Sequence, residues 1–206
     1  TDDYHPTQIF ADLLTVRETF GSLDANICIA YVGDGRNNVA NSLMVVCAKL
    51  GINFVACAPS ANFPEENLVK ECRQIAAENG CTIELTDDVK KGTKNADVIY
   101  TDIWVSMGEP KELWKERIQL LSPYQVNKEV MSYAKKEAIF LHCLPSFHDL
   151  NTTVGRQIYE EFGLKEMEVT DEVFESEQSK VFDQAENRMH TIKAILYATL
   201  REDLDE

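Results

Sequence analysis

Apolar residues along this chain fall into short runs that alternate with longer segments of helical periodicity. Five runs rich in Val, Ile, Phe and Ala predict buried strands over residues 26–32, 53–58, 81–85, 96–101 and 138–142. Helical spacing predicts helices over residues 6–20, 38–50, 65–79, 89–94, 110–121, 127–136, 154–162, 171–174 and 179–201. Strands that alternate with helices indicate an α/β fold: a doubly wound, Rossmann-like, parallel five-stranded sheet with helices on both faces.

Proline, glycine and asparagine residues indicate where several of the predicted helices begin or end. Pro6 suits the first turn of the first helix, and Gly80 suits the position just after the third. Asn37 or Asn38 is expected to cap the helix that follows the first strand, since Asn is among the preferred N-cap residues.

The charge balance and the cysteines narrow the class of protein. With 20 basic and 35 acidic residues the net charge is −15, which argues against a nucleic-acid partner. No run approaches the roughly 18 apolar residues of a membrane span, and residues 1–6 do not resemble a secretory signal. The six cysteines form no CxxC pair, so we expect buried, reduced thiols and a cytoplasmic location.

Two loops that follow predicted strands carry the richest chemistry. One is Asp102-Ile-Trp-Val-Ser-Met-Gly108, which offers a carboxylate, a hydroxyl and free backbone N–H groups. The other is His142-Cys-Leu-Pro145, which offers an imidazole, a thiol and a stiff turn. Ligands of open α/β sheets bind outside the carboxyl ends of the strands. The two loops together predict a site for a small amino acid.

Two other interpretations fit the residues less well. The loop Gly33-Asp-Gly-Arg-Asn-Asn38 has Asn38 where a dinucleotide fingerprint has its third glycine, and no acid follows the second strand. A carboxylate at this helix N-terminus fits better. The spacing of His142, Cys143 and His148 matches no structural zinc motif, so no metal is expected.

Each remaining candidate has an ordinary structural explanation as well as a functional one. Cys143 alone could be a packed thiol, and Asp102, Ser106 and Met107 alone could form a simple turn. His5 could cap a helix at the surface, or could point a donor at a carbonyl oxygen with Gln8 one turn further along the helix. Arg188 could be an exposed helical arginine or could hold an anion.

Five motifs taken in order resemble those of the ornithine carbamoyltransferases. They are His5-Pro-Thr-Gln8, Gly33-Asp-Gly-Arg-Asn-Asn38, Asp102-Ile-Trp-Val-Ser-Met-Gly108, His142-Cys-Leu-Pro145 and Glu186-Asn-Arg-Met-His190. The Ser-Met-Gly and His-Cys-Leu-Pro segments separate the chain from aspartate carbamoyltransferases, in which the motif corresponding to His-Cys-Leu-Pro resembles His-Pro-Leu-Pro. The resemblance implies transfer of the carbamoyl group of carbamoyl phosphate to the δ-amine of L-ornithine. The products are L-citrulline and phosphate, in arginine metabolism.

The same resemblance implies roles for individual residues. The residues implied for carbamoyl phosphate are His5, Gln8, Cys143, Leu144 and Arg188. Those implied for ornithine are Asn38, Asp102, Ser106 and Met107. The catalytic candidates are His5, Asp102, Cys143 and Arg188, with His5 helping to stabilise the developing oxyanion. No cofactor is implied.

The resemblance also implies an organisation of the chain. Residues 1–20 form a linking helix, 21–178 the ornithine-binding domain, and 179–206 a helix that packs back on a carbamoyl-phosphate domain. The Ser-Thr-Arg-Thr loop of that domain has no counterpart here, so we expect a fragment without useful activity alone. Family members are homotrimers or multiples of trimers. Two alternatives stay open: a paralogue that carbamoylates another amine, such as putrescine, and a binding or assembly module.

Overall fold

The computed structural model describes residues 1–105 and 110–201, and their core is a five-stranded parallel sheet. Its strands are β1 (Cys28–Val32), β2 (Asn53–Cys57), β3 (Ile83–Thr86), β4 (Val98–Thr101) and β5 (Ile139–His142). The order across the sheet is β3-β2-β1-β4-β5, with every pairing parallel. The predicted fold class is confirmed.

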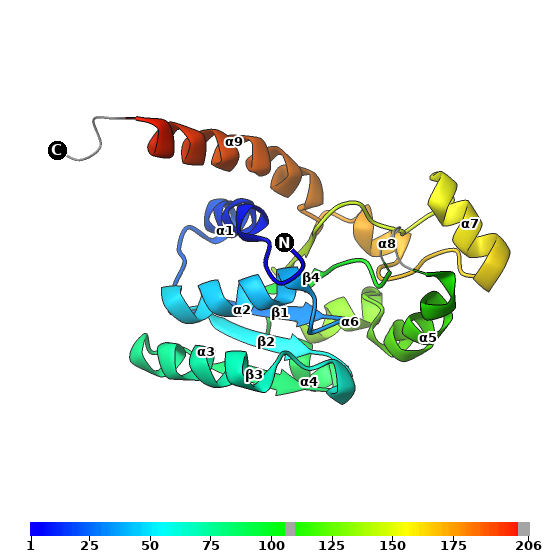
Figure 1. Cartoon of the computed structure of the whole chain (residues 1–206), viewed down its shortest axis with the longest axis horizontal. Helices are drawn as coiled ribbons and strands as arrows, with labels where there is room; N and C mark the ends of the chain where they lie inside the picture. The colour runs from blue at the N-terminus through cyan, green and yellow to red at the C-terminus, as the bar shows by residue number, and fades with distance from the viewer. Residues whose placement is uncertain (106–109, 202–206) are drawn as a thin grey trace.

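One face of the sheet is covered by α1 (Pro6–Phe20), α2 (Asn38–Leu50) and α3 (Glu66–Glu78). Alternate strand residues such as Ile29, Phe54 and Leu141 point into this side of the core, as the two-residue period of a strand requires. The long helix α9 (Val181–Leu200) crosses the outside of α1, which therefore lies between α9 and α2 (Figure 1).

The opposite face is covered by α4 (Val89–Thr93), α6 (Lys128–Tyr133) and α8 (Asp171–Phe174). A third apolar cluster joins α5 (Lys111–Leu121) to α7 (Thr153–Phe162) around Trp104 and Trp114. Two short 3₁₀ turns, Ser60–Asn62 and Ser122–Tyr124, complete the described elements. No helix in the described ranges is long and apolar enough to cross a membrane.

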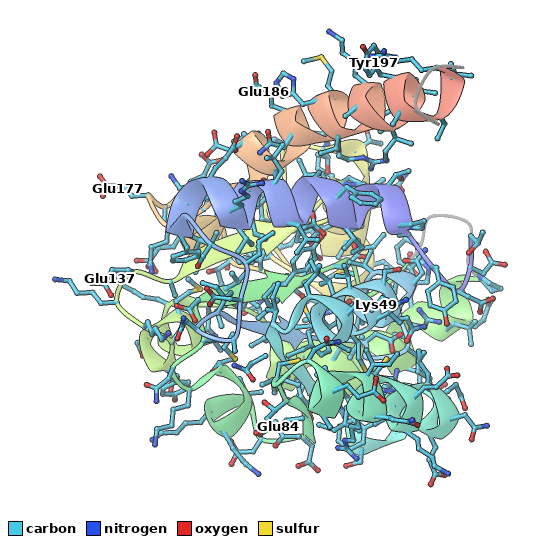
Figure 2. The ribbon with its side chains drawn as sticks, turned by 90° about the vertical axis from the view of Figure 1, so that its left-hand side faces the viewer. Lys49, Glu84, Glu137, Glu177, Glu186 and Tyr197 are labelled. Atoms are coloured by element: carbon cyan, nitrogen blue, oxygen red, sulfur yellow. The ribbon has the colours of Figure 1, made fainter. Side chains whose placement is uncertain are left out.

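The outer side of α9 is apolar and exposed. Phe182, Met189, Leu196, Tyr197 and Leu200 each keep more than half of their surface accessible. Figure 2 shows Tyr197 on the side of α9 that is turned away from α1. The expectation that this helix presents an apolar face is confirmed for the residues that the structure describes.

Predicted and observed boundaries agree closely, with one clear exception. The first helix begins at Pro6 and ends before Gly21, whose φ of +80° is a left-handed helix cap. The helix predicted over residues 127–136 ends instead at Tyr133. The reason is tertiary: the Lys135 N–H donates to the Ala96 carbonyl at 3.0 Å, and its ammonium pairs with Asp97 at 2.8 Å.

Candidate functional site

The candidate site lies at the point where the strand order of the sheet reverses, between β1 and β4. From β1 the chain adds β2 and β3 on one side, then crosses back to place β4 and β5 on the other. Loops after β1 and β4 diverge at such a point and leave a crevice at the carboxyl edge. Asp102 directly follows β4 and Cys143 directly follows β5, so both lie at this edge as the sequence predicts.

Asp102 is a nearly buried carboxylate with an unusual pKa. Only 7 % of its surface is exposed, and Oδ1 accepts the Ile103 N–H at 2.8 Å. Burial raises its pKa to about 6, although nearby His142, the Ile103 N–H and a hydrogen bond with Asn37 act in the opposite direction. No Lys or Arg is among these described neighbours, so the carboxylate can still balance the charge of a ligand cation.

Asn37 is the N-cap residue of α2, the helix that follows β1. Its side chain accepts the Val39 N–H at 2.7 Å, which fixes the start of α2, and it also hydrogen-bonds Asp102. Asn38, the ornithine-binding candidate, donates from Nδ2 to the Thr1 carbonyl at 2.8 Å. The structure thus brings Asn37 to Asp102 by a direct contact, and Asn38 lies one residue further along the helix.

The His142 loop is anchored from beneath by Glu168, which the sequence analysis did not single out. The Glu168 side chain is fully buried, and its Oε1 lies 3.1 Å from His142 Nε2. The same oxygen accepts Ser146 Oγ at 2.8 Å and the Phe147 N–H at 2.7 Å. Burial opposes the ionised form of Glu168, but the hydrogen bond and electrostatic attraction of His142, together with the Phe147 N–H, prevail and lower the pKa of Glu168.

Cys143 and Leu144 come directly after His142, the residue that Glu168 contacts. Leu144 precedes Pro145 through a cis peptide bond and lines a pocket, whereas Cys143 keeps only 8 % of its surface exposed. Burial, together with the charges of Asp102 and Asp12, raises the pKa of the Cys143 thiol well above its usual range. The thiol is therefore neutral near pH 7 and is not a thiolate nucleophile or base.

Gln8 and Arg188 come together from the two ends of the chain. Arg188 Nη1 on α9 donates to Gln8 Oε1 on α1 at 3.0 Å. Both residues line a pocket of about 150 Å³, together with His142, Leu144, Val181, Gln184 and Ala185. The structure thus places two of the predicted carbamoyl-binding side chains and Leu144 around one small polar cavity.

His5 stands at the start of α1, beside this pair. Its backbone N–H donates to Ser42 Oγ at 2.8 Å, which ties the beginning of α1 to α2. Burial and the positive charge of Arg188 lower the pKa of its imidazole. A neutral imidazole next to a guanidinium can donate one N–H to an oxygen without adding a second cation to the cavity.

Two further polar side chains belong to this cluster and were missed in the sequence. Asp12 and Gln184, each only 1 % exposed, lie beneath the Gln8–Arg188 pair, and Gln184 Nε2 donates to Asp12 Oδ1 at 2.6 Å. Each is four residues from a named candidate, Asp12 from Gln8 and Gln184 from Arg188. That spacing puts both members of a pair on one helix face, and it is the signal that could have found them.

Some predicted features lie elsewhere or outside the described residues. Ser106 and Met107 fall in the range 106–109, outside the part of the chain that the structure describes. His148 does not join His142: its Nδ1 lies 2.8 Å from Asp171, and its ring stacks on Phe174. The zinc-like grouping of His142, Cys143 and His148 is therefore divided between separate partners.

A larger hollow of about 520 Å³ lies between α1 and α9. Its lining carries an excess of negative charge, with the carboxylates of Glu18, Asp183 and Glu186 against the single ammonium of Lys180 and the imidazole of His190. This charge disfavours a phosphate or a carboxylate ligand, because like charges repel at close range. The smaller pocket at Arg188 suits an anionic or polar ligand better.

Comparisons with known proteins identify the family to which the chain is similar. Residues 25–199 match the family model described as "Aspartate/ornithine carbamoyltransferase, Asp/Orn binding domain". A relative described as catabolic ornithine carbamoyltransferase of Treponema denticola is 62 % identical over 97 % of this chain and 59 % of its own length. An ornithine carbamoyltransferase of Staphylococcus aureus strain Newman is 58 % identical over 98 % of this chain and 61 % of its own.

Solved structures agree with the sequence relatives. The ornithine carbamoyltransferase of Pyrococcus furiosus has a TM-score of 0.80 at 42 % identity, over 95 % of this chain and 56 % of that one. The enzyme of Gloeobacter violaceus has a TM-score of 0.81 at 37 % identity, over 98 % of this chain and 60 % of that one. The chain spans about three fifths of the length of the curated relatives it matches.

Proposed function

This chain belongs to the aspartate/ornithine carbamoyltransferase family, and we propose that the whole protein transfers a carbamoyl group from carbamoyl phosphate to the δ-amine of L-ornithine. The amine nitrogen forms a bond to the carbonyl carbon, the bond from that carbon to the phosphate oxygen breaks, and the amine loses a proton. The products are L-citrulline and phosphate. The chain would supply the amino-acid half of the site.

The observation that carries this proposal is the carboxylate of Asp102 at the end of β4. It is nearly buried, and the neighbours that favour its ionised form, His142, the Ile103 N–H and Asn37, include no Lys or Arg. In our proposal the α-ammonium of ornithine supplies the missing charge. The α-carboxylate would meet Asn38 and the N-terminus of α2, and Ser106 and Met107 would complete this end of the site.

The carbamoyl group would occupy the pocket of Gln8, Leu144 and Arg188. There Arg188 and a neutral His5 would donate to its carbonyl oxygen, which gains negative charge as the amine attacks. Cys143 would lie beside the δ-amine as a neutral thiol, so it would orient the amine and would not remove its proton. Much of the rate would come from holding the two substrates in contact.

An assay of several amines tests the reaction and the substrate together. The whole protein, given carbamoyl phosphate, should form product from L-ornithine and much less from putrescine, which lacks both α groups. L-Aspartate should give no product. A preference for putrescine would favour the alternative that the protein is a paralogue that carbamoylates another amine. Absence of any product would favour the alternative that it is a binding or assembly module.

The raised pKa of Asp102 predicts a pH dependence that can be separated from that of the δ-amine. L-Norvaline has the α groups of ornithine but no δ-amine, so its inhibition constant reports on the α end alone. Below about pH 6 Asp102 becomes neutral, and we expect norvaline to bind about tenfold more weakly for each further pH unit. Above about pH 7 the inhibition constant should be flat until the α-ammonium itself titrates. A norvaline inhibition constant that does not change from pH 5 to pH 8 would show that Asp102 does not bind the α-ammonium.

Replacement of Cys143 by serine should lower kcat/KM for L-ornithine by about tenfold, since a hydroxyl is smaller and hydrogen-bonds differently. The fold should stay intact. Cys72→Ser in α3 is the matched control, because that thiol is also buried in the same apolar cluster but lies on a helix that packs against α2 and β3. Equal kinetics for the two variants would reduce Cys143 to a packing residue.

The exposed faces of α1 and α9 fit the remaining parts of the proposal. Phe10 on α1, like the apolar residues on the outer side of α9, has more than half of its surface accessible. Patches of this kind mark interaction surfaces. We expect residues 1–20 and 179–206 to flank the amino-acid-binding unit of 21–178, and to pack against a carbamoyl-phosphate domain of the whole protein. A homotrimer is the oligomer we expect, which light scattering can measure.

A further inference from the structure

Asp12 is a buried carboxylate that the proposed reaction does not use. It lies on α1 with 1 % of its surface exposed, between α9 and the sheet. Three side-chain donors converge on it: Gln8 Nε2 at 2.8 Å, Gln184 Nε2 at 2.6 Å and the Tyr100 hydroxyl at 3.1 Å. A carboxylate is expensive to bury, so its full set of partners calls for an explanation.

The two glutamines are oriented by this one carboxylate. An amide has a donor end and an acceptor end, and both glutamines turn their donor end towards Asp12 Oδ1. The acceptor ends must then face the other way. Gln8 Oε1 accepts Arg188 Nη1 at 3.0 Å, and Gln184 Oε1 accepts the His142 N–H at 3.0 Å.

Without Asp12 the NH₂ group of Gln8 would lose its acceptor, and that of Gln184 would keep only the Tyr100 hydroxyl, which lies 3.1 Å from Nε2. A half-turn of the Gln8 amide would point its NH₂ group at the Arg188 guanidinium, where two donors oppose each other and the arginine loses its acceptor. A half-turn at Gln184 would likewise place a donor against the His142 N–H at the start of the Cys143 loop. Gln8 and Gln184, which both line the candidate carbamoyl pocket, therefore share one acceptor, Asp12 Oδ1.

We propose that Asp12 is a positioning residue for carbamoyl recognition. By fixing the orientation of the Gln8 and Gln184 amides, it sets the position of Arg188 relative to the His142 loop. The inference rests on the proposed function for its substrate, and on the hydrogen bonds alone for its geometry. Asp12 touches no substrate in this account. It acts through the side chains that do.

A role in stability alone is the competing explanation, and two variants separate the roles. In Asp12→Asn the side-chain oxygen can take the place of Oδ1 and accept both amides, while Nδ2 faces the Tyr100 hydroxyl. Asp12→Leu keeps a similar volume and removes the acceptor. Asp97→Asn is the matched control, because Asp97 is also buried, accepts the Cys28 N–H and pairs with Lys135, but lies at the opposite edge of the sheet.

Steady-state kinetics of the whole protein test the proposal. We expect Asp12→Leu to raise KM for carbamoyl phosphate by about tenfold or more, with a smaller change in KM for ornithine, because displaced contact groups lose much of their effect. Asp12→Asn should return the carbamoyl phosphate KM to within about threefold of the parent. Asp97→Asn should lower the melting temperature without raising this KM. Asp12→Leu with an unchanged KM, or Asp97→Asn with the same rise, would overturn the proposal.

Crystal structures of the variants keep the test independent of activity. In Asp12→Asn the contact between Gln8 Oε1 and Arg188 Nη1 should persist near 3.0 Å, and in Asp12→Leu it should be lost. A parent protein that forms no citrulline would refute the proposed function but not the geometry. If Asp12→Leu does not fold, the Asn variant decides: loss of the Gln8–Arg188 contact despite the retained oxygen would overturn the positioning role.

Discussion

Replacing Asp102 by asparagine is expected to lower kcat/KM for L-ornithine by about 100-fold, or about 3 kcal/mol of transition-state stabilisation. The amide keeps the size of the side chain and can still accept the Ile103 N–H. It cannot balance the α-ammonium of the substrate. Since burial weakens the competition from water, the missing charge should be felt strongly.

Asp97→Asn is the matched control for this prediction as well. Asp97 and Asp102 stand at opposite ends of β4, and both are nearly buried. The control should lose stability, because it breaks the contact with Lys135, but should keep its kinetics. An Asp102 variant within twofold of the parent in kcat/KM for ornithine would exclude the carboxylate from the site.

Arg188→Met should raise KM for carbamoyl phosphate by about 100-fold, as expected for loss of a charged hydrogen-bond donor to an anion. Arg188 is the one cationic side chain that lines the candidate pocket in the described structure, and the chain as a whole carries a net charge of −15. Methionine preserves the apolar stem. The helix should remain docked, because Asn187 still donates to Thr15 at 3.0 Å and to Glu18 at 2.8 Å.

The control for Arg188→Met is Lys70→Met, which removes an exposed cation from α3 on a different part of the surface. It alters the net charge of the chain by the same amount. A similar rise in KM for both variants would mean that the overall field, and not a contact with Arg188, governs the binding of the anion.

The sequence predicts the fold well because its elements are strongly patterned and clearly punctuated. The helix Pro6–Phe20 agrees at both ends with the prediction, since Pro6 and Gly21 mark the two ends. The helix Lys128–Tyr133 is shorter than its local pattern, because Lys135 is drawn into contacts with Ala96 and Asp97. Such long-range contacts leave no trace in a local periodicity.

The candidate site is predictable to the same extent and for the same reason. Asp102 and Cys143 follow parallel strands, and the carboxyl ends of such strands meet at one edge, so their proximity follows from the order of elements. The direction of a side chain is harder to foresee. The sequence leaves the cap of α2 open between Asn37 and Asn38; in the structure Asn37 is the cap and also contacts Asp102, whereas the Asn38 side chain donates to the Thr1 carbonyl.

Helix spacing could mark Asp12 and Gln184 as neighbours of Gln8 and Arg188, but the sequence does not show that the two residues meet in one buried polar network. Asp12 and Gln184 are 172 positions apart and meet only because α9 returns across α1. Glu168 reaches His142 from a segment without regular structure before α8. These residues support side chains that the motifs name, and their importance appears only when the packing is known.

The most direct test of the central claim is a crystal structure of the whole protein with carbamoyl phosphate and L-norvaline. The account predicts that the α-ammonium of norvaline lies within hydrogen-bond distance of the Asp102 carboxylate, and that its side chain ends beside Cys143. The carbamoyl oxygen should contact Arg188, with Gln8 alongside. Norvaline bound away from the carboxyl ends of β4 and β5, or with its ammonium paired elsewhere, would contradict the account.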